Sequence, residues 1–324
     1  MAMPKTKLAT FGIECRLGGQ RAMSVLVRTA PESGADAMRL NQHCYCITLD
    51  RDALGAAIER ETGDPNFYAE YVGTRSNLFS NVPVFIATSA LADMRRVVAA
   101  IEAATRLPNY RRTVLDWAPE ISRPDHGPIG ALMGYDFHLE GDVARLIEVN
   151  TNAGGAFLNA MLARAQRACC LEVEQNFDLH STEGFDASVL RMFQNEWRLQ
   201  RGTGALKRIA IVDDQPQEQY LYPEFILARQ SLAKAGLHVI IAGPNELAYK
   251  GGQLLGGGSA IDLVYNRLVD FSLALPEHEA LRAAYVDGAV VVTPNPHNHA
   301  LFADKRNLTL LSDRATLSGW GLSD

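Results

Sequence analysis

The sequence lacks the features that would assign it to a membrane, to secretion or to nucleic acid. No apolar run approaches the roughly 20 residues of a bilayer-spanning helix. No apolar core of a signal peptide follows the opening segment Met1–Lys7. The formal net charge of −6 provides no general attraction to nucleic acid or anionic membranes. We therefore expect a cytoplasmic protein with no nucleic-acid or membrane partner.

Cysteines are also scarce. Their number, five, is odd and would leave one unpaired, so a disulfide framework is not expected. Cys44 and Cys46 follow His43, but this spacing is not usual for zinc ligands and no second ligand pair follows at a plausible distance. Hydrophobic residues make up 47% of the chain and charged residues 21%, a balance typical of a folded globular protein rather than a disordered one.

The stretch from Ala144 to Phe157 contains the most informative pattern. Leu146, Glu148 and Asn150 fall at alternate positions of a predicted strand, and residues two apart on a strand share a face. A carboxylate and an amide presented together suit a hard cation such as Mg²⁺. A polar turn with two glycines and a helix predicted over 158–176 follow. A strand, a glycine turn and a helix N-terminus in this order indicate a place for anions.

The segment 135–139 and this strand form a predicted β-hairpin whose turn begins at Gly141. A three-residue loop would set Asp136 opposite Glu148, whereas a two-residue turn would set Asp136 opposite Ile147. Only the first register places Asp136 on the face of the proposed metal ligands. The pattern leaves both registers open.

The hydrophobic period changes after the glycine-containing segment Arg201–Ala205, which we interpret as a domain boundary. Strands predicted at 208–213 and 237–242 enclose a helix at 222–235, which is a βαβ unit. Lys250–Ser259 is rich in glycine but opens no helix, so it is predicted to form a hairpin rather than a phosphate loop. The remaining predictions are strands at 261–267 and 288–293, a loop at 294–299 and a helix at 303–312.

Asn266 and Arg267 end the strand at 261–267. Ligands of open α/β sheets favour the carboxyl ends of the strands. Arg267 is therefore a candidate for binding an anionic substrate, and a structural ion pair is the alternative.

These residues resemble a known family. Asp136-Phe-His-Leu followed by Ile147-Glu-Val-Asn-Thr-Asn-Ala-Gly-Gly is similar to the Asp…Glu-x-Asn signature of the eukaryotic-type glutathione synthetases, which are circularly permuted ATP-grasp ligases. Val264-Tyr-Asn-Arg267 resembles the family's Tyr-x-Arg strand, whose arginine faces the peptide substrate. The order of the parts also agrees, and Asp304-Lys305 matches the family's Asp-Lys helix start.

The resemblance implies a fold of the α/β class, in which a mixed α+β ATP-grasp-like part carries the Glu-x-Asn strand and a Rossmann-like parallel α/β domain is inserted. It implies an ATP-dependent carboxylate–amine ligase that works through an acyl phosphate, with ATP and Mg²⁺. The expected partner is a small-molecule or short-peptide substrate with a carboxylate, and a homodimer is left open. The expected site residues are Glu148 and Asn150 for the metal; Lys305, Gly154 and Gly155 for the nucleotide; Asp136, Asn152 and Asn266 for the substrate; and Arg267 for catalysis.

The same comparison divides the chain. Residues 1–204 would form an N-terminal ATP-grasp-like region with the metal-binding hairpin, and 205–302 a Rossmann-like substrate-binding domain. Residues 303–324 would begin the remaining ATP-grasp part.

The sequence also departs from the family. The family's arginine two residues before the aspartate is Gly134 here, and its dipeptide-binding serines are Ala153 and Gly155, so glutathione is not the expected product. In the family a glycine-rich lid follows the Asp-Lys helix, and only 19 residues follow Lys305 here. A site without its lid would leave an acyl phosphate open to water. We therefore expect either an incomplete ligase chain or a non-catalytic small-molecule binding protein on the same scaffold.

Overall fold

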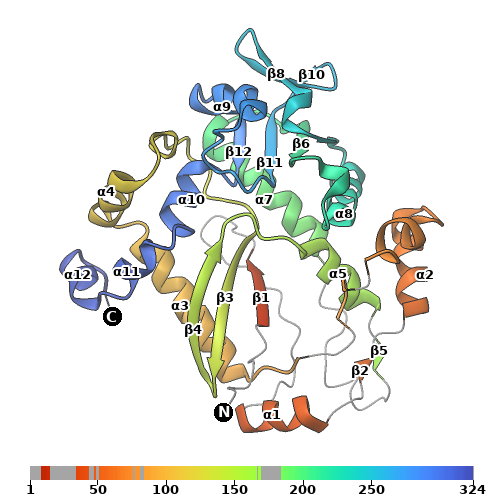
Figure 1. Ribbon diagram of the computed structural model, residues 1–324, viewed down its shortest axis with the longest axis vertical. Helices are drawn as coiled ribbons and strands as arrows, with labels where there is room; N and C mark the ends of the chain where they lie inside the picture. Colours follow the sequence, from red (N-terminus) through yellow and green to blue (C-terminus); the bar gives the residue numbers. More distant parts are fainter. Residues whose placement is uncertain are drawn as a thin grey trace.

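Helices are combined with both parallel and antiparallel sheets in a mixed α/β arrangement (Figure 1). The computed structural model describes residues 9–14, 34–43, 47–48, 51–75, 77–80, 84–165, 167–168 and 184–323. All five cysteines lie outside these ranges, so the expectations about disulfides and zinc stay predictions.

A four-stranded parallel sheet forms the upper part of the molecule in Figure 1. Its order is β12 (Val291–Thr293), β11 (Leu263–Asn266), β6 (Arg208–Val212) and β7 (His238–Ala242). The helix α8 (Tyr222–Lys234) connects β6 to β7, which confirms the predicted βαβ unit.

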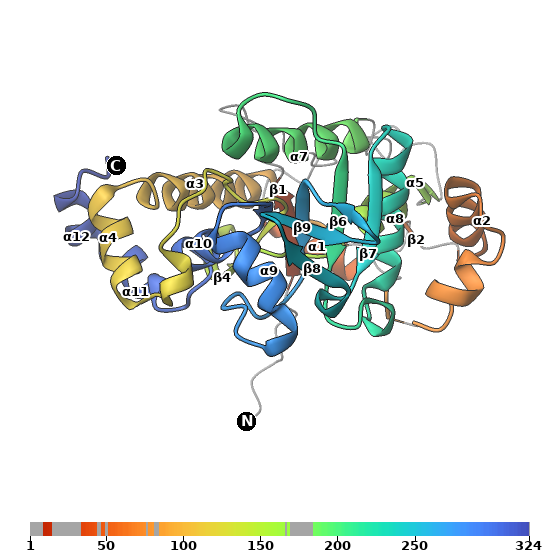
Figure 2. The same ribbon diagram turned by 90° about the horizontal axis from the view of Figure 1, so that it is seen from above.

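The strand β6 is buried on both faces. Ile209 and Ile211 enter one hydrophobic cluster, while Ala210 and Val212 enter another, as the two-residue period of a strand requires. Figure 2 shows α7 (Phe185–Arg201) and α9 (Glu279–Val286) on opposite sides of this sheet. Such two-sided burial explains why the strand sequence is continuously apolar.

The glycine-rich segment forms a small antiparallel sheet of β8 (Leu247–Lys250), β9 (Gln253–Gly256) and β10 (Ser259–Ala260). Two Gly-Gly pairs, at 251–252 and 257–258, make its turns with positive φ at all four residues. Two-residue hairpin turns favour such conformations, which glycine adopts without a steric penalty. The predicted hairpin is therefore confirmed.

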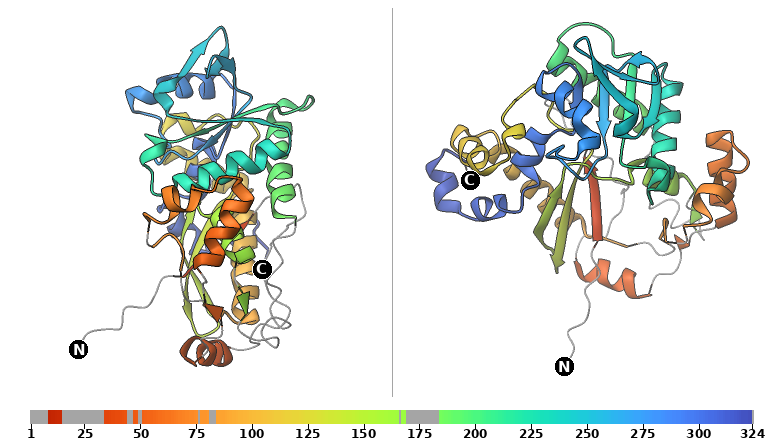
Figure 3. Two further views of the ribbon diagram at one scale, coloured as in Figure 1. Left: turned by 90° about the vertical axis from the view of Figure 1, so that its right-hand side faces the viewer. Right: turned by 45° about the horizontal axis from the view of Figure 1, so that its top comes forward.

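A second antiparallel sheet has the order β1 (Ala9–Glu14), β3 (Met133–Glu140) and β4 (Val143–Asn150). It lies below the parallel sheet, as the right-hand view of Figure 3 shows. The helix α3 (Thr88–Ala104) packs along it, and side chains of this helix, the sheet and α4 (Pro108–Trp117) share one hydrophobic cluster.

The remaining elements are short. They are the helices α1 (Gly34–His43), α2 (Arg51–Thr62), α5 (Ala156–Ala165), α10 (Pro296–Phe302), α11 (Asn307–Leu311) and α12 (Arg314–Gly319), the π-helix η1 (Tyr68–Val72), the 3₁₀ turns η2 (Glu120–Ser122), η3 (Pro216–Glu218), η4 (Pro244–Glu246) and η5 (Pro276–His278), and the strands β2 (Ile47–Thr48) and β5 (Arg167–Ala168). The helix predicted over 158–176 is wrong at residues 167–168, which pair with β2 as a strand, while residues 166 and 169–176 lie outside the described ranges.

Two predictions around residue 300 are also wrong. Residues 296–302 form the helix α10 instead of a loop, because the Asn295 side chain accepts a hydrogen bond from the Asn298 amide and Pro296 follows the cap. No helix begins at Asp304, since the chain turns there and α11 starts at Asn307.

The division into segments at residues 205 and 303 stays a prediction. One hydrophobic cluster contains side chains from both sides of residue 205, among them Phe157 and Phe193 with Ile209 and Leu263. The two segments therefore share part of their core.

Candidate functional site

The hairpin of β3 and β4 brings Asp136 opposite Glu148, but by a different route from either predicted register. Its turn has two residues, since Glu140 pairs with Val143. That turn alone would set Asp136 opposite Ile147. A bulge between Asp136 and Phe137 adds one residue to β4 and moves the pairing on to Glu148. Of the two turns that the sequence left open, the hairpin has the two-residue one, and the bulge still brings Asp136 to the face of Glu148.

Four polar side chains meet at the end of this hairpin. The Asn150 amide nitrogen lies 3.2 Å from Asp136 Oδ2 and 3.3 Å from Glu148 Oε1. Lys305 reaches the group from the turn after α10, and its Nζ atom lies 3.0 Å from Glu148 Oε2. We call Asp136, Glu148 and Asn150 the carboxylate cluster. Within the described part of the chain, no three His, Cys, Asp or Glu side chains gather as a metal site, and the third member of this cluster is an amide.

The charges of the cluster are unevenly compensated. Asp136 is only 8% exposed, and among the described residues its Oδ1 atom has no hydrogen-bond partner. Burial, and after it the neighbouring Glu148 charge, raises the pKa of Asp136. The hydrogen bond from Lys305, followed by that from Asn150, lowers the pKa of Glu148. The cluster thus has one buried carboxylate oxygen that a cation could bind.

Arg267 lies at the carboxyl end of β11, as predicted, and is 6% exposed. Its guanidinium donates hydrogen bonds to the backbone carbonyls of Asn152 and Ala153, the latter at 2.8 Å. Gly154 allows this approach, because a Cβ atom there would lie 2.9 Å from Arg267 Nη2. Arg267 therefore holds the turn that follows the carboxylate cluster, and its Nε atom is buried without a hydrogen-bond partner among the described residues.

The sequence suggests that the N-terminus of α5 binds anions, and in the structure a carboxylate of the chain itself already lies there. Glu224 of α8 is 1% exposed and accepts hydrogen bonds from the amides of Phe157 at 3.1 Å and Leu158 at 2.9 Å. A carboxylate is stabilised at this position by the partial positive charge of the helix end. The amides of Phe157 and Leu158 are therefore not available for phosphate. The nucleotide role of Gly154 and Gly155 stays a prediction.

The two predicted asparagines are engaged in backbone contacts. The Asn152 amide donates to the Leu268 carbonyl at 3.1 Å. Asn266 is fully buried; it donates to the Pro294 carbonyl at 3.2 Å and accepts from the Leu268 amide at 3.1 Å. Asn152 thus connects the turn after β4 to Leu268, and Asn266 connects the end of β11 to Pro294. A direct role of either side chain in binding substrate stays a prediction.

Asp213 follows β6 at the point where the sheet order reverses. The chain runs from β6 to β7 on one side and returns with β11 on the other, so residues after β6 and β11 meet at a topological switch point. Asp213 is 8% exposed, and burial raises the pKa of its carboxyl to about 6, although the nearby Arg267 charge opposes the change. A carboxyl that titrates near neutrality at such an edge is typical of ligand sites.

Asp213 and Glu224 are not among the site residues predicted from the sequence. Asp213 ends a predicted strand, so the rule that selected Arg267 would also have selected this carboxylate. Glu224 stands in the first turn of a helix beside the apolar residues Phe225–Leu227, which indicates a buried charge that needs partners.

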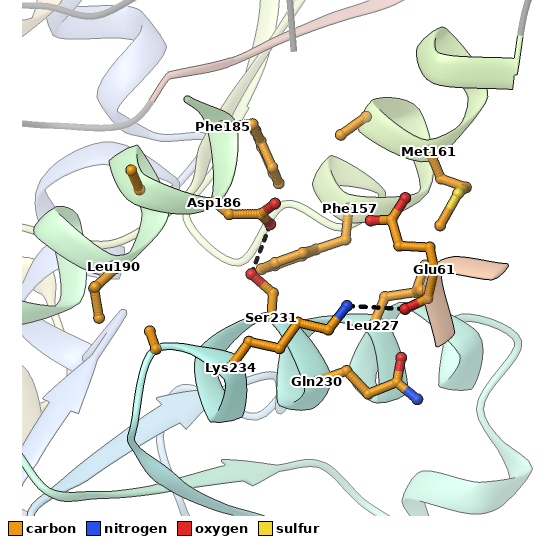
Figure 4. A pocket seen from close by; sticks show the side chains of 13 residues that line it. Glu61, Phe157, Met161, Phe185, Asp186, Leu190, Leu227, Gln230, Ser231 and Lys234 are labelled. Atoms are coloured by element: carbon orange, nitrogen blue, oxygen red, sulfur yellow. Dashed lines mark hydrogen bonds between the residues drawn. The ribbon is translucent and has the colours of Figure 1, made fainter. Parts of the chain in front are cut away.

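A pocket of about 310 Å³ lies between α5, α7 and α8 (Figure 4). Phe157, Met161 and Leu227 form part of its apolar lining, and a hydrogen bond of 2.6 Å from Ser231 to Asp186 crosses it. None of the predicted site residues lines this pocket. Because the buried carboxylate oxygen and the charged groups at the strand ends lie outside this pocket, we place the candidate site at the carboxylate cluster and the strand ends.

No helix in the described ranges has both the length and the apolar character needed to span a membrane. Comparison with known proteins adds a likeness of fold. No protein-family model matches the chain, and no curated protein does. Among solved structures, a glutathione synthetase-like effector from Globodera pallida, determined in its apo form, is similar. The match has a TM-score of 0.50 and 13% sequence identity, and it covers 85% of this chain and 70% of the other.

Proposed function

We propose that this chain carries the metal-binding and substrate-binding parts of an ATP-dependent carboxylate–amine ligase of the circularly permuted ATP-grasp type. The observation that carries the proposal is the meeting of Asp136, Glu148, Asn150 and Lys305 at one end of a hairpin. The resemblance of the Glu-x-Asn and Tyr-x-Arg segments and the likeness of fold to a glutathione synthetase-like effector support it.

The cluster fits Mg²⁺ by its chemistry. Asp136 offers a buried oxygen without a hydrogen-bond partner among the described residues, and Glu148 offers a second carboxylate. The oxygen and nitrogen of the Asn150 amide are interchangeable by rotation, so its oxygen can take the place of the nitrogen that faces the carboxylates. Such all-oxygen sets are those that Mg²⁺ binds together with substrate phosphates, whose charge it neutralises during phosphoryl transfer.

The chain's own residues have distinct tasks in this proposal. Lys305 binds a phosphate group of the nucleotide, and Arg267 orients the substrate carboxylate at the carboxyl end of β11. The turn that Arg267 holds connects these two regions, so the cation and the substrate are positioned by one rigid segment. Positioning of this kind supplies much of the rate in phosphoryl transfer. The substrate is a small molecule or short peptide with a carboxylate.

The test uses Mn²⁺ as a spectroscopic substitute for Mg²⁺. The wild-type chain should bind Mn²⁺ in an electron paramagnetic resonance titration, and Glu148→Gln should weaken binding at least about tenfold, by analogy with the loss caused by altering residues around a metal. Glu140→Gln is the matched control, since Glu140 lies on the same hairpin with its side chain 71% exposed and paired with Arg145. Equal Mn²⁺ binding by the wild type and Glu148→Gln would contradict the proposal.

Turnover is tested separately by phosphate release from ATP in the presence of peptide carboxylates and amines. A complete ligase releases phosphate only when both are present and Mg²⁺ is added, whereas the metal-binding and substrate-binding parts alone should release none.

A second candidate is a non-catalytic binding protein on the same scaffold. The observation in its favour is Glu224, which takes two amides of the α5 N-terminus that a phosphate would otherwise use. This candidate predicts that calorimetry detects binding of a carboxylate ligand without nucleotide, and that ATP does not bind with Mg²⁺ present. ATP binding that depends on Glu148 would exclude it.

A further inference from the structure

We propose that Lys305 is an internal counter-cation of the carboxylate cluster, that a divalent cation displaces it from Glu148, and that the displaced ammonium group then becomes available to a phosphate. The inference rests on the proposed function, because it presupposes that the cluster binds a divalent cation. It adds an order of events in which the cation releases the lysine before the nucleotide can use it.

Lys305 occupies a carboxylate that a divalent cation would also need. Lys305 Nζ lies 3.0 Å from Glu148 Oε2, while the other oxygen of Glu148 faces the Asn150 amide. A divalent cation held by Glu148 and Asp136 would be drawn to the same carboxylate, and two positive groups at one carboxylate repel each other. Binding of the cation and the ion pair of Lys305 are therefore competing events.

The exposed side chain of Lys305 is able to leave Glu148. Its side chain is 76% exposed, and an ion pair so open to solvent is weak enough to exchange. The neighbouring Arg306 cannot replace it, because its guanidinium is bound to Asp304 and lies over the Trp117 ring. The backbone beneath is anchored, since the buried Asn307 side chain donates to the Ala300 carbonyl at 2.8 Å. A fixed backbone with a mobile side chain is suited to exchange between two partners.

Lys305 also balances the negative charge of the carboxylate cluster. Asp136 and Glu148 face each other across the hairpin, and each raises the free energy of the other's charged form. Lys305 supplies a positive charge to this pair through its contact with Glu148. Because coupling between ligands is reciprocal, a cation that frees Lys305 for phosphate must itself bind more tightly when phosphate is present.

The experiment measures Mn²⁺ affinity by electron paramagnetic resonance in the full chain without nucleotide. Lys305→Met should bind Mn²⁺ about two to five times more tightly than the wild type, the range that corresponds to loss of an exposed ion pair. Arg306→Gln removes an equal charge from the neighbouring residue, which has no contact with Glu148, and should change the affinity less than about twofold.

A second measurement follows the lysine directly. Reductive methylation read by mass spectrometry should modify Lys305 at least about twice as fast when Mg²⁺ is present, because the amine is no longer held by the carboxylate. The exposed Lys250 serves as an internal reference whose rate should not change. In Glu148→Gln, Lys305 should react quickly whether or not Mg²⁺ is added.

The outcomes separate the two proposals. Absence of Mn²⁺ binding by the wild type would overturn both the metal site and the exchange. Mn²⁺ binding that Glu148→Gln abolishes but Lys305→Met leaves unchanged would overturn the exchange alone. An equal gain in Lys305→Met and Arg306→Gln would also overturn it, since the effect would then be one of general charge.

Discussion

Asp213→Asn should change how the stability of the protein depends on pH. Asp213 lies after β6, 8% exposed, and its Oδ1 atom accepts a hydrogen bond of 2.9 Å from the Asp214 amide. Asparagine keeps an oxygen for that bond and a similar shape. The substitution therefore removes the ionisable group while leaving most of the packing in place.

The magnitude follows from the pKa. Burial raises the pKa of Asp213 from its ordinary 3.8 to about 6 in the folded chain. At about 1.4 kcal/mol for each tenfold change in proton affinity, this difference corresponds to at most about 3 kcal/mol. The folded chain holds the proton more tightly than the unfolded chain, so stability falls as the pH rises from about 4 to above 6. Below about pH 4, Asp213 is protonated in both the folded and the unfolded chain, so its charge no longer lowers the free energy of unfolding.

The free energy of unfolding should be measured by urea titration at several pH values from 4.5 to 7.5, for the wild type and Asp213→Asn. The variant should gain up to about 3 kcal/mol relative to the wild type across this range, because it lacks the buried charge. Asp116→Asn, an exposed position on α4, should show no such gain. A difference between Asp213→Asn and the wild type that is constant with pH would refute the reasoning, and a loss would mean that Arg267 favours the charged form.

Two further predictions concern the turn after the carboxylate cluster. Gly154→Ala should lower the free energy of unfolding by about 1 to 3 kcal/mol in urea titrations, because the new Cβ atom would lie 2.5 Å from Leu221 Cδ1 and 2.9 Å from Arg267 Nη2. Gly319→Ala, with no atom within 4 Å of the added Cβ, is the control and should not destabilise the protein. An equal loss at both positions would contradict the contact with Arg267. Glu224→Gln should destabilise by about 1 to 3 kcal/mol in the same assay at pH 7, because an NH₂ group would then face one of the two α5 amides. An unchanged urea midpoint would mean that these amides do not depend on the carboxylate.

The periodic segments could be predicted from the sequence. The apolar runs at 208–213 and 237–242 became β6 and β7, and the glycine pairs at 251–252 and 257–258 became turns. Local rules suffice here, since strand alternation and the demand for positive φ act between residues close in the chain. The shared face of Glu148 and Asn150 belongs to the same class of inference.

The helix boundaries could not be predicted where a distant segment intervenes. The helix predicted to residue 176 ends at Ala165 because residues 167–168 pair with β2, which is over a hundred residues earlier. The helix α10 depends on a cap by Asn295, a signal that the sequence contains although the proline-rich segment 294–299 predicts a loop. Local propensity is weak compared with such pairings and caps.

For the site, the sequence determined which chemical groups stand on one strand, because the two-residue period of a strand is a local property. Only the tertiary structure decided that a bulge returns Asp136 to the face of Glu148, and that Lys305 arrives there from more than 150 residues away. It also decided that Glu224 accepts hydrogen bonds from the amides of the α5 N-terminus and that Arg267 donates to the carbonyls of the turn after β4. These contacts depend on how separate elements pack, and the free energy that selects a packing is shared among many side chains rather than encoded in any one segment.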